Sequence, residues 1–200
     1  MAKKIILALT VIIAIVSIFV FLNLMNDTVN VFIDGENVTV KTNTPFNRNP
    51  NLNKEICNYT FDVMNDTESN VSTLKEGIGE ICKKNCIENP KIKIDSTIGE
   101  NQIPVIVYVE GTSMLPTLKD GQTALLNKSK DIKIGDIVVA DSDEYGGIIK
   151  RVSQINGDEV YLTSDNKNVN YEYHNGALYE VKGITTWVDI SDINGVVIGY

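Results

Sequence analysis

The pattern of apolar and polar positions changes character twice along the chain. Residues 5–22 are almost continuously apolar, interrupted only by one threonine and one serine. Helical and alternating patterns are then mixed, until short alternating runs take over near residue 101. The pattern predicts three parts. These are an N-terminal tip with one transmembrane helix (1–26), a small α+β accessory region (27–100) and a mainly β domain (101–200).

The apolar run over residues 5–22 is long enough to cross a bilayer, because about 20 helical residues span the hydrocarbon layer. A cleaved secretory signal is the alternative, but the run exceeds the usual apolar core of such signals and no small-residue cleavage site follows it. Lys3 and Lys4 precede the run, and no Lys or Arg follows until Lys41. The positive-inside rule therefore predicts a cytoplasmic N-terminus and an extracytoplasmic remainder.

The accessory region begins with a predicted hairpin over residues 29–42, which turns at Asp34-Gly35. Apolar residues at helical spacing predict two helices, over residues 52–63 and 74–82. Residues 88–101 are interpreted as a connector. The role of the region stays open, and a protein partner could bind there.

The β domain is predicted from short runs of β-branched and aromatic residues that are separated by Gly, Asn and Asp. Many short strands with regular turns are typical of an all-β barrel or sandwich. The expected strands cover residues 103–110, 123–126, 136–140, 148–153, 159–163, 177–181 and 196–198.

Three cysteines fall in the predicted external part, where an oxidising compartment permits a disulfide. The favoured interpretation joins Cys57 to Cys82 or Cys86 and leaves one thiol over. A three-cysteine metal site lacks a nearby fourth ligand, so neither a metal nor another cofactor is expected. The net charge of −8, with no large cluster of Lys and Arg, argues against a nucleic-acid partner.

Ser113 is a candidate nucleophile, because it lies on an irregular segment after a predicted strand that ends at Glu110. Gly111 permits backbone conformations that other residues avoid, and Pro116 disfavours a helical continuation. The Ser113 hydroxyl and backbone N–H can therefore face a cleft, where the N–H would serve an oxyanion hole. A serine of this kind still needs a positioned base.

Lys150 is the candidate base. On a strand it shares its face with Ile148 and Val152, so its surroundings are apolar. Burial disfavours the charged ammonium, and the pKa of Lys150 is expected to fall. The alternative is a lysine at a sheet edge whose charged end reaches water.

Four motifs around this pair occur together in one order and at compatible spacing. They resemble the type I signal peptidase family, and the resemblance covers roughly residues 103–200. It implies a membrane-bound serine endopeptidase with a β-rich, signal-peptidase-like catalytic domain, in which Ser113 is the nucleophile and Lys150 the general base. The motifs are Gly111–Leu118, Gly135–Val139, Ile149–Val152 with Asn156-Gly157-Asp158, and Thr163–Lys167.

The chain also departs from the family pattern. Its tail is similar to the archaeal and endoplasmic-reticulum branch, which carries His where Lys150 stands, whereas lysine is the bacterial form. The resemblance implies that Asp165 and Asn166 support the site, although a plain turn aspartate is an alternative for Asp165. Gly111 stands where some members supply a hydroxyl to the oxyanion hole. Asn170 stands where bacterial members place a serine near the lysine.

By resemblance, the enzyme would cleave signal peptides from secreted precursors on the outer side of the membrane. The partners would be these precursors and the lipid bilayer. Small residues would be preferred at the positions one and three before the cut. The substrate could pair in extended form with the strand that carries Val105, Val107 and Val109.

Three alternatives remain. The protein could be a dedicated processing peptidase for one surface protein. It could be an inactive, membrane-anchored binding or assembly protein with this fold, in which case Ser113 and Lys150 should lie too far apart to hydrogen-bond. A self-cleaving Ser-Lys protease of the phage and SOS repressor type fits poorly, because that class lacks an N-terminal anchor and usually carries a DNA-binding domain.

Overall fold

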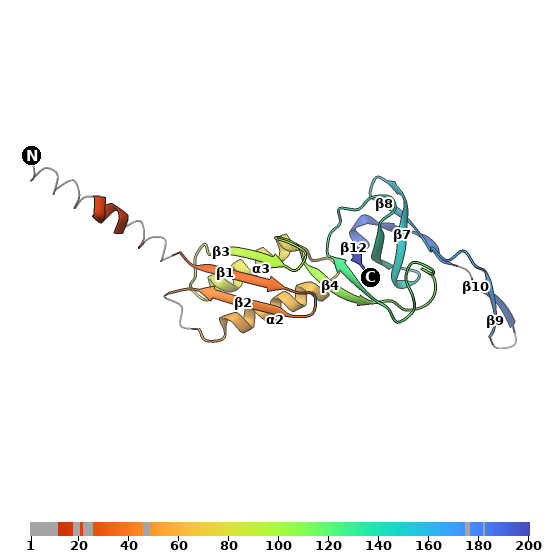
Figure 1. Ribbon diagram of the computed structural model, residues 1–200, viewed down its shortest axis with the longest axis horizontal. Helices are drawn as coiled ribbons and strands as arrows, with labels where there is room; N and C mark the ends of the chain where they lie inside the picture. The colour runs from red at the N-terminus through yellow and green to blue at the C-terminus, as the bar shows by residue number, and fades with distance from the viewer. Residues whose placement is uncertain (1–11, 18–20, 22–25, 46–48, 175–176, 182) are drawn as a thin grey trace, which may run out of the picture.

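The computed structural model describes residues 12–17, 21, 26–45, 49–174, 177–181 and 183–200 (Figure 1). Most of the predicted membrane span over residues 5–22 lies outside these ranges. Within them, no helix is both long and apolar enough to cross a bilayer. The transmembrane helix therefore stays a prediction.

The accessory region folds as a small sheet with two helices. Its described strands form a sheet in the order β2-β1-β3, in which β1 is antiparallel to β2 and parallel to β3. The predicted hairpin and both predicted helices are confirmed. The elements are β1 (Thr28–Ile33), β2 (Val38–Asn43), α2 (Leu52–Asn65), α3 (Val71–Lys84) and β3 (Lys91–Ser96).

The connector predicted over residues 88–101 is wrong in its middle, because it contains β3. Ile92 and Ile94 alternate with lysines there, which is the period-two pattern of a strand with one buried face. The strand pairs in parallel with β1, and Val31 lies opposite Ile94. A parallel partner is reached through a long crossover rather than a tight turn. No hairpin signal next to β3 therefore marked it in the sequence.

The core of the accessory region lies between its sheet and its helices. Val29, Val31 and Ile33 of β1 are buried there together with residues of α2 and α3. The helices approach each other closely at Gly77, where an added Cβ would lie 2.1 Å from the ring of Tyr59. The Tyr59 hydroxyl donates to the carbonyl of Thr73 at 3.0 Å, which fixes the two helices against each other.

All three cysteines fall in the described part of the chain and are free thiols. The disulfide predicted between Cys57 and Cys82 or Cys86 is therefore wrong for this structure. Cys57 Sγ donates to the carbonyl of Val38 at 3.6 Å, whereas Cys82 is buried in the accessory core. Cys86 is exposed beyond the end of α3. Burial raises the pKa of the Cys82 thiol, which keeps it protonated.

The β-rich character of the second half is confirmed. Its described strands form one curled sheet in the order β11-β8-β7-β6-β12-β5-β4, with β11 and β4 at the edges. Strands β9 and β10 form a separate hairpin that projects away from the sheet (Figure 1). β9 and β11 were not predicted. The strands are β4 (Pro104–Tyr108), β5 (Thr123–Asn127), β6 (Ile137–Ser142), β7 (Gly146–Asn156), β8 (Glu159–Thr163), β9 (Asn170–His174), β10 (Ala177–Val181), β11 (Thr185–Asp189) and β12 (Ile193–Gly199).

The segment that carries Ser113 is held against this sheet by two buried side chains. Met114 and Leu118 pack into a cluster with Val109 at the end of β4, Ala124 of β5 and Ile137 of β6. Burying a side chain of this size contributes about 1.5–3 kcal/mol, so the two side chains pin an otherwise irregular loop. The serine between Gly111 and Met114 is thereby fixed in place relative to the strands.

The two parts of the chain share a packed joint near the predicted division at residue 100, and that division stays a prediction. Ile103 is fully buried within the accessory core although it belongs to the β-domain side of the boundary. Lys128 Nζ donates to the carbonyl of Asp66 at the end of α2. Burial lowers the pKa of Lys128, as expected for an ammonium taken out of water.

Candidate active site

Ser113 lies on a loop whose backbone is set by Gly111. The φ angle of Gly111 is +84°, a conformation that favours glycine, as its sequence position predicted. Its N–H donates to Asp120 Oδ1 at 2.8 Å, which ties the start of the loop to its far end. The N–H of Leu118 donates to the carbonyl of Met114 at 2.9 Å and closes the following turn.

Lys150 lies on β7, opposite Val138 of β6, and only 3% of its surface is exposed. Its Nζ donates to Ser113 Oγ at 2.9 Å and to the carbonyl of Ile149 at 3.0 Å. The structure therefore brings the predicted nucleophile and base into hydrogen-bond contact. The next residue, Arg151, is less buried than Lys150, as expected where successive residues of a strand face opposite sides of the sheet.

Desolvation lowers the pKa of Lys150, because burial disfavours the charged ammonium. A neutral amine has one lone pair and two hydrogens. If one hydrogen bonds the Ile149 carbonyl, the lone pair can accept the hydrogen bond that the Ser113 hydroxyl donates. A backbone carbonyl thus orients the amine in this chain, in which Asn170 stands where bacterial members place a serine near the lysine.

Asn166 holds the backbone on both sides of Ser113. Its N–H donates to the carbonyl of Ser113 at 2.9 Å, and its Nδ2 donates to the carbonyl of Thr112 at 2.9 Å. The Thr112 carbonyl and the Ser113 N–H belong to one planar peptide unit and point in opposite directions. Asn166 therefore fixes the direction of the Ser113 N–H, for which the oxyanion role stays a prediction.

The Asp165 carboxylate accepts its hydrogen bonds from Arg151 and Thr117 and anchors the loop that carries Asn166. Arg151 Nε and Nη2 donate to its two carboxylate oxygens at 2.7 and 2.5 Å. The Thr117 hydroxyl donates to the same carboxylate at 2.5 Å. The hydrogen bonds from Arg151 lower the pKa of Asp165, and the carboxylate raises the pKa of Arg151. The ion pair connects β7, the serine loop and the Asn166 loop.

Gly183 supports the same loop by having no side chain. A Cβ at Gly183 would lie 2.6 Å from Cβ of Ser164 and 2.7 Å from the carbonyl oxygen of Asn166. Beside it, the Ser164 hydroxyl donates to the carbonyl of Ile184 at 2.9 Å. Any larger residue at position 183 would push directly on Asn166.

A groove of about 500 Å³ opens onto the Ser113–Lys150 pair. Val107 and Tyr108 of the edge strand β4 line it from one element, and Gly147 to Lys150 of β7 line it from another. Of the three valines predicted to meet the substrate, only Val107 lines the groove. Val105 packs against the accessory core, and Val109 is buried beneath the serine loop.

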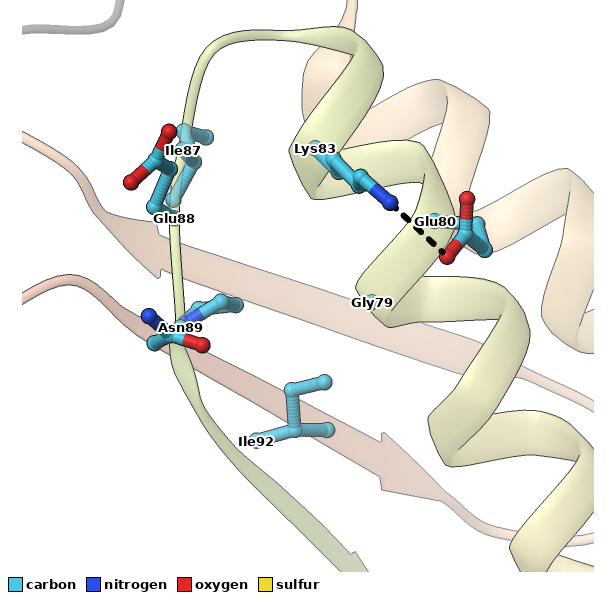
Figure 2. Close-up of a pocket in the computed structure, with 8 residues that line it drawn as sticks. Gly79, Glu80, Lys83, Ile87, Glu88, Asn89 and Ile92 are labelled. Carbon is cyan, nitrogen blue, oxygen red and sulfur yellow. Dashed lines mark ion pairs between the residues drawn. The ribbon is translucent and has the colours of Figure 1, made fainter.

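A second hollow of similar volume lies between α3 and the segment leading into β3 (Figure 2). Glu80 and Lys83 form an ion pair at its wall, with Nζ 3.8 Å from Oε1. Its lining holds no serine or cysteine beside a base, so volume alone does not locate the active site. Over the described part of the chain, no three His, Cys, Asp or Glu side chains cluster closely enough to hold a metal ion.

Sequence reasoning missed several groups that build this site. Arg151 and Thr117 were noted only as parts of the family motifs, and Asp120 and Gly183 were not singled out. The β7–β8 hairpin sets Arg151 opposite Thr163, two residues before Asp165, but a bulge between Val152 and Gln154 shifts this register, so the turn position did not indicate the pair. No local pattern indicates Gly183, since its neighbours come from a different loop.

Comparison with known proteins agrees with this geometry. The profile of the Peptidase S24-like family matches residues 74–185, more than half of the chain, and the match includes Ser113, Lys150 and Asp165. A signal peptidase I from Bacillus licheniformis is 40% identical over 67 residues. That similarity covers 31% of this chain and 36% of the relative, so the chain spans about a third of the relative's length. No solved structure matches the chain significantly.

Proposed function

The chain belongs to the Peptidase S24-like family, and on that premise we propose that it is a membrane-anchored serine endopeptidase that removes signal peptides from secreted precursors. The segment shared with a signal peptidase I supports a peptidase of this superfamily. The observation that carries the proposal is the 2.9 Å contact between Lys150 Nζ and Ser113 Oγ at the floor of an open groove. A serine becomes a nucleophile only beside such a base.

In the proposed mechanism, neutral Lys150 takes the proton of the Ser113 hydroxyl as Oγ attacks the scissile carbonyl. The carbonyl oxygen becomes an oxyanion, which the Ser113 N–H stabilises from the direction set by Asn166. Protonated Lys150 then gives its proton to the leaving amine, and an acyl-enzyme remains. Lys150 next takes a proton from a water molecule that attacks the ester, and protonated Lys150 returns that proton to Ser113 Oγ as the product leaves as a carboxylic acid, which then ionises in water.

The groove suits an extended substrate. Among the described strands, β4 pairs only with β5, so its other edge is open to a peptide that adds as a further strand. Val107 and Tyr108 of β4 and Lys150 of β7 face the same groove. A substrate on β4 would therefore pass the nucleophile. The preference for small residues before the cut follows from the family resemblance.

Membrane anchoring is proposed from the sequence, through the apolar residues 5–22 and the lysines that precede them. The anchor would place the groove on the outer side of the membrane, where precursors emerge. A dedicated processing peptidase for one surface protein would use the same chemistry. The Ser113–Lys150 hydrogen bond speaks against an inactive binding protein, for which we expected the two side chains to be apart.

The test is cleavage of a signal-peptide precursor by the full chain in proteoliposomes. We expect Ser113→Ala and Lys150→Ala each to abolish processing. Ser142→Ala and Lys128→Met are matched controls, because both replace a buried residue of the same type outside the groove. We expect the controls to keep activity. Full processing by either Ser113→Ala or Lys150→Ala would overturn the dyad. Failure of the unsubstituted chain to cleave any precursor would overturn the proposed function.

A further inference from the structure

The chain enters the accessory region at one end of its sheet. Strand β1 begins at Thr28, shortly after the predicted membrane span that ends at residue 22. The carbonyl of Asp27 accepts a hydrogen bond from the N–H of Lys91 at 2.8 Å, so the start of β3 lies at this end too. We call this end, where Thr28 pairs with Lys91 and Asn43, the anchor end.

The β domain is attached at the opposite end. A Cβ on Gly35, in the turn after β1, would lie 3.3 Å from Ile106 of β4 and 3.6 Å from Leu125 of β5. Lys128 donates to the Asp66 carbonyl in the turn between α2 and α3. In Figure 1, β1 and β3 both run from the anchor end toward the β domain. The accessory region therefore lies between the predicted membrane anchor and Ser113.

The joint at this second end is packed. Ile103 is fully buried in the accessory core, and its carbonyl accepts from the N–H of Lys128 at 3.0 Å. Val105 of β4 packs against the same core. Lys75 Nζ donates to Asn101 Oδ1 at 2.6 Å across the boundary. Two elements that share a core move together, so the β domain does not swing freely on a linker.

The distribution of charge favours an accessory region that stands on the bilayer with its anchor end toward the lipid and its β-domain end away from it. Five carboxylates lie in or next to the β1–β2 and α2–α3 turns at the end next to the β domain, where Asp95, Glu100 and the lysine Lys75 also lie, whereas five exposed lysines lie toward the anchor end, where four carboxylates nearly balance them. An anionic bilayer surface repels carboxylates and attracts lysines, so it disfavours contact with the β-domain end. The five carboxylates are Asp34, Glu36, Asp62, Asp66 and Glu68, and the lysines are Lys41, Lys54, Lys83, Lys84 and Lys91. The carboxylates at the anchor end are Asp27, Glu55, Glu80 and Glu88.

We propose that the accessory region is a rigid spacer that holds Ser113 off the bilayer and so selects substrates by the position of their cleavage site. Strand β1 has 6 residues, and at about 3.3 Å per residue it spans about 20 Å. An extended substrate needs about six residues to cover that height before its scissile bond reaches the groove. The substrates are therefore membrane-spanning precursors whose cut lies at least about six residues beyond the lipid surface. This inference rests on the proposed anchor and peptidase activity.

The test uses the full chain in anionic proteoliposomes with a series of membrane-spanning substrates. All four substrates carry the same cleavage sequence. A flexible spacer of roughly two, six, ten or fourteen residues separates it from the membrane span. A tether that cannot reach the site has an effective concentration near zero, so we expect cleavage of the shortest substrate to be at least about tenfold slower than that of the longest. Equal rates across the series would overturn the spacer.

The same cleavage sequence with each of the four spacers, made as soluble peptides without a span, separates this inference from the proposed function. We expect the chain to cleave them at equal rates, because no tether limits their approach to the groove. If none of the peptides and none of the spanning substrates is cleaved, the proposed function fails. If the soluble peptides are cleaved while all spanning substrates are cleaved equally, only the spacer fails.

Trp187 gives a second readout that needs no substrate. It is the single tryptophan of the chain, lies on β11 of the β domain and is 44% exposed. We expect weak energy transfer from Trp187 to dansyl-labelled lipids. A double variant, Trp187→Phe with Asn43→Trp, carries its single tryptophan at the anchor end instead. It should show much stronger energy transfer to the labelled lipids. Equal transfer from the two positions would mean that the β domain lies on the bilayer and would overturn the spacer.

Discussion

Lys150 Nζ lies 2.9 Å from Ser113 Oγ, although the two residues are 37 positions apart in the chain. The contact is made because β7 carries Lys150 beneath a loop that Met114 and Leu118 pin to the sheet. Each partner is common by itself. The chemistry of the pair depends on the burial of Lys150, which lowers the pKa of its amine below the value it has in water.

The first prediction concerns the pH dependence of cleavage. Only neutral Lys150 can accept the Ser113 proton, so kcat/KM should rise with pH as Lys150 loses its proton. Burial lowers the pKa of Lys150, so the rise should be centred below the ordinary lysine value of 10.5. A pH–rate profile with a soluble peptide measures this. A rise centred at the ordinary value would contradict a buried base. Lys150→Arg should be inactive throughout, because arginine keeps its proton.

The second prediction concerns stability. The pKa of Lys150 is lower in the folded state than the ordinary 10.5 of the unfolded chain. The unfolded state therefore binds more protons between these two values, and the free energy of unfolding rises with pH across that window. Lys150→Met removes the free-energy cost of burying a lysine that is protonated in the unfolded chain. It should stabilise the protein at neutral pH by about 0.5–2 kcal/mol while abolishing cleavage.

The gain from Lys150→Met should shrink as the pH rises toward 10.5, because wild-type Lys150 is then neutral in both states. Urea unfolding of both proteins at several pH values measures the difference. Lys128 titrates in both proteins, so its own lowered pKa cancels in the comparison. A constant difference across the whole pH range would argue that Lys150 is not desolvated.

The third prediction concerns Asn166, which fixes the direction of the Ser113 N–H through the Thr112 carbonyl. Asn166→Asp keeps the size of the side chain but removes the Nδ2 donor. Complete loss of an oxyanion donor costs about 10²–10³ in kcat. Because the N–H would be misdirected rather than removed, we expect a smaller loss in kcat of about tenfold, with KM little changed.

Asn168→Ala is the matched control for Asn166→Asp, since Asn168 has an exposed side chain on the same loop and only its N–H contacts Asn166, with 3.0 Å between N and Oδ1. Its kcat should stay within about twofold of the wild-type value, as for surface substitutions that change free energies by less than about 0.5 kcal/mol. If Asn166→Asp retained full kcat, the Asn166 contact would have no part in orienting the oxyanion donor.

The sequence predicted the parts of this protein that depend on local pattern. The Asp34-Gly35 turn set the β1–β2 hairpin, and the apolar spacing of Leu74 and Ile78 marked α3. Motifs found Ser113 and Lys150. β3 was missed because its partner β1 lies across a long crossover. The disulfide failed for the same kind of reason, since cysteine spacing does not say that Cys57 faces β2 while Cys82 is buried in the core.

The site residues that sequence reasoning missed act through distant contacts. The hydrogen bond from Thr117 to Asp165 joins residues 48 positions apart, and neither position shows a periodic pattern that would pair them. Asp165 was identified as a supporting residue only through the family motif. Its ion pair with Arg151 follows from the register of β7 and β8, which the positions of turns alone do not determine because a bulge interrupts it.

The fourth prediction concerns Asp165. Asp165→Asn loses two charge-assisted hydrogen bonds from Arg151 and should lower the free energy of unfolding by about 1.5–3 kcal/mol at neutral pH. The pKa of Asp165 is lowered from its ordinary 3.8, chiefly by Arg151. Its contribution is therefore fully present above that value and is lost as the pH falls through the lowered folded pKa.

Urea unfolding of wild type and Asp165→Asn between neutral and strongly acidic pH tests this. The difference between the proteins should narrow only in acid below the ordinary carboxylate value of 3.8. Glu159→Gln serves as the control, because Glu159 is an exposed carboxylate on β8 and should change stability by less than about 0.5 kcal/mol. A difference between wild type and Asp165→Asn that persists unchanged in acid would assign the effect to packing instead of charge.

The fifth prediction concerns Gly183. Gly183→Ala places a Cβ 2.7 Å from the carbonyl oxygen of Asn166 and 2.6 Å from Ser164 Cβ, so the Asn166 loop must shift. Overpacking of this kind costs about 1–3 kcal/mol. Because Asn166 holds both peptide groups beside Ser113, kcat should fall together with stability.

Gly79→Ala is the matched control, since nothing lies within 4 Å of a Cβ at that helical position. It should stabilise α3 by up to about 1 kcal/mol and leave kcat unchanged. Unchanged stability and kcat in Gly183→Ala would show that the Asn166 loop can move without consequence for the serine, and would remove Asn166 from the positioning of Ser113.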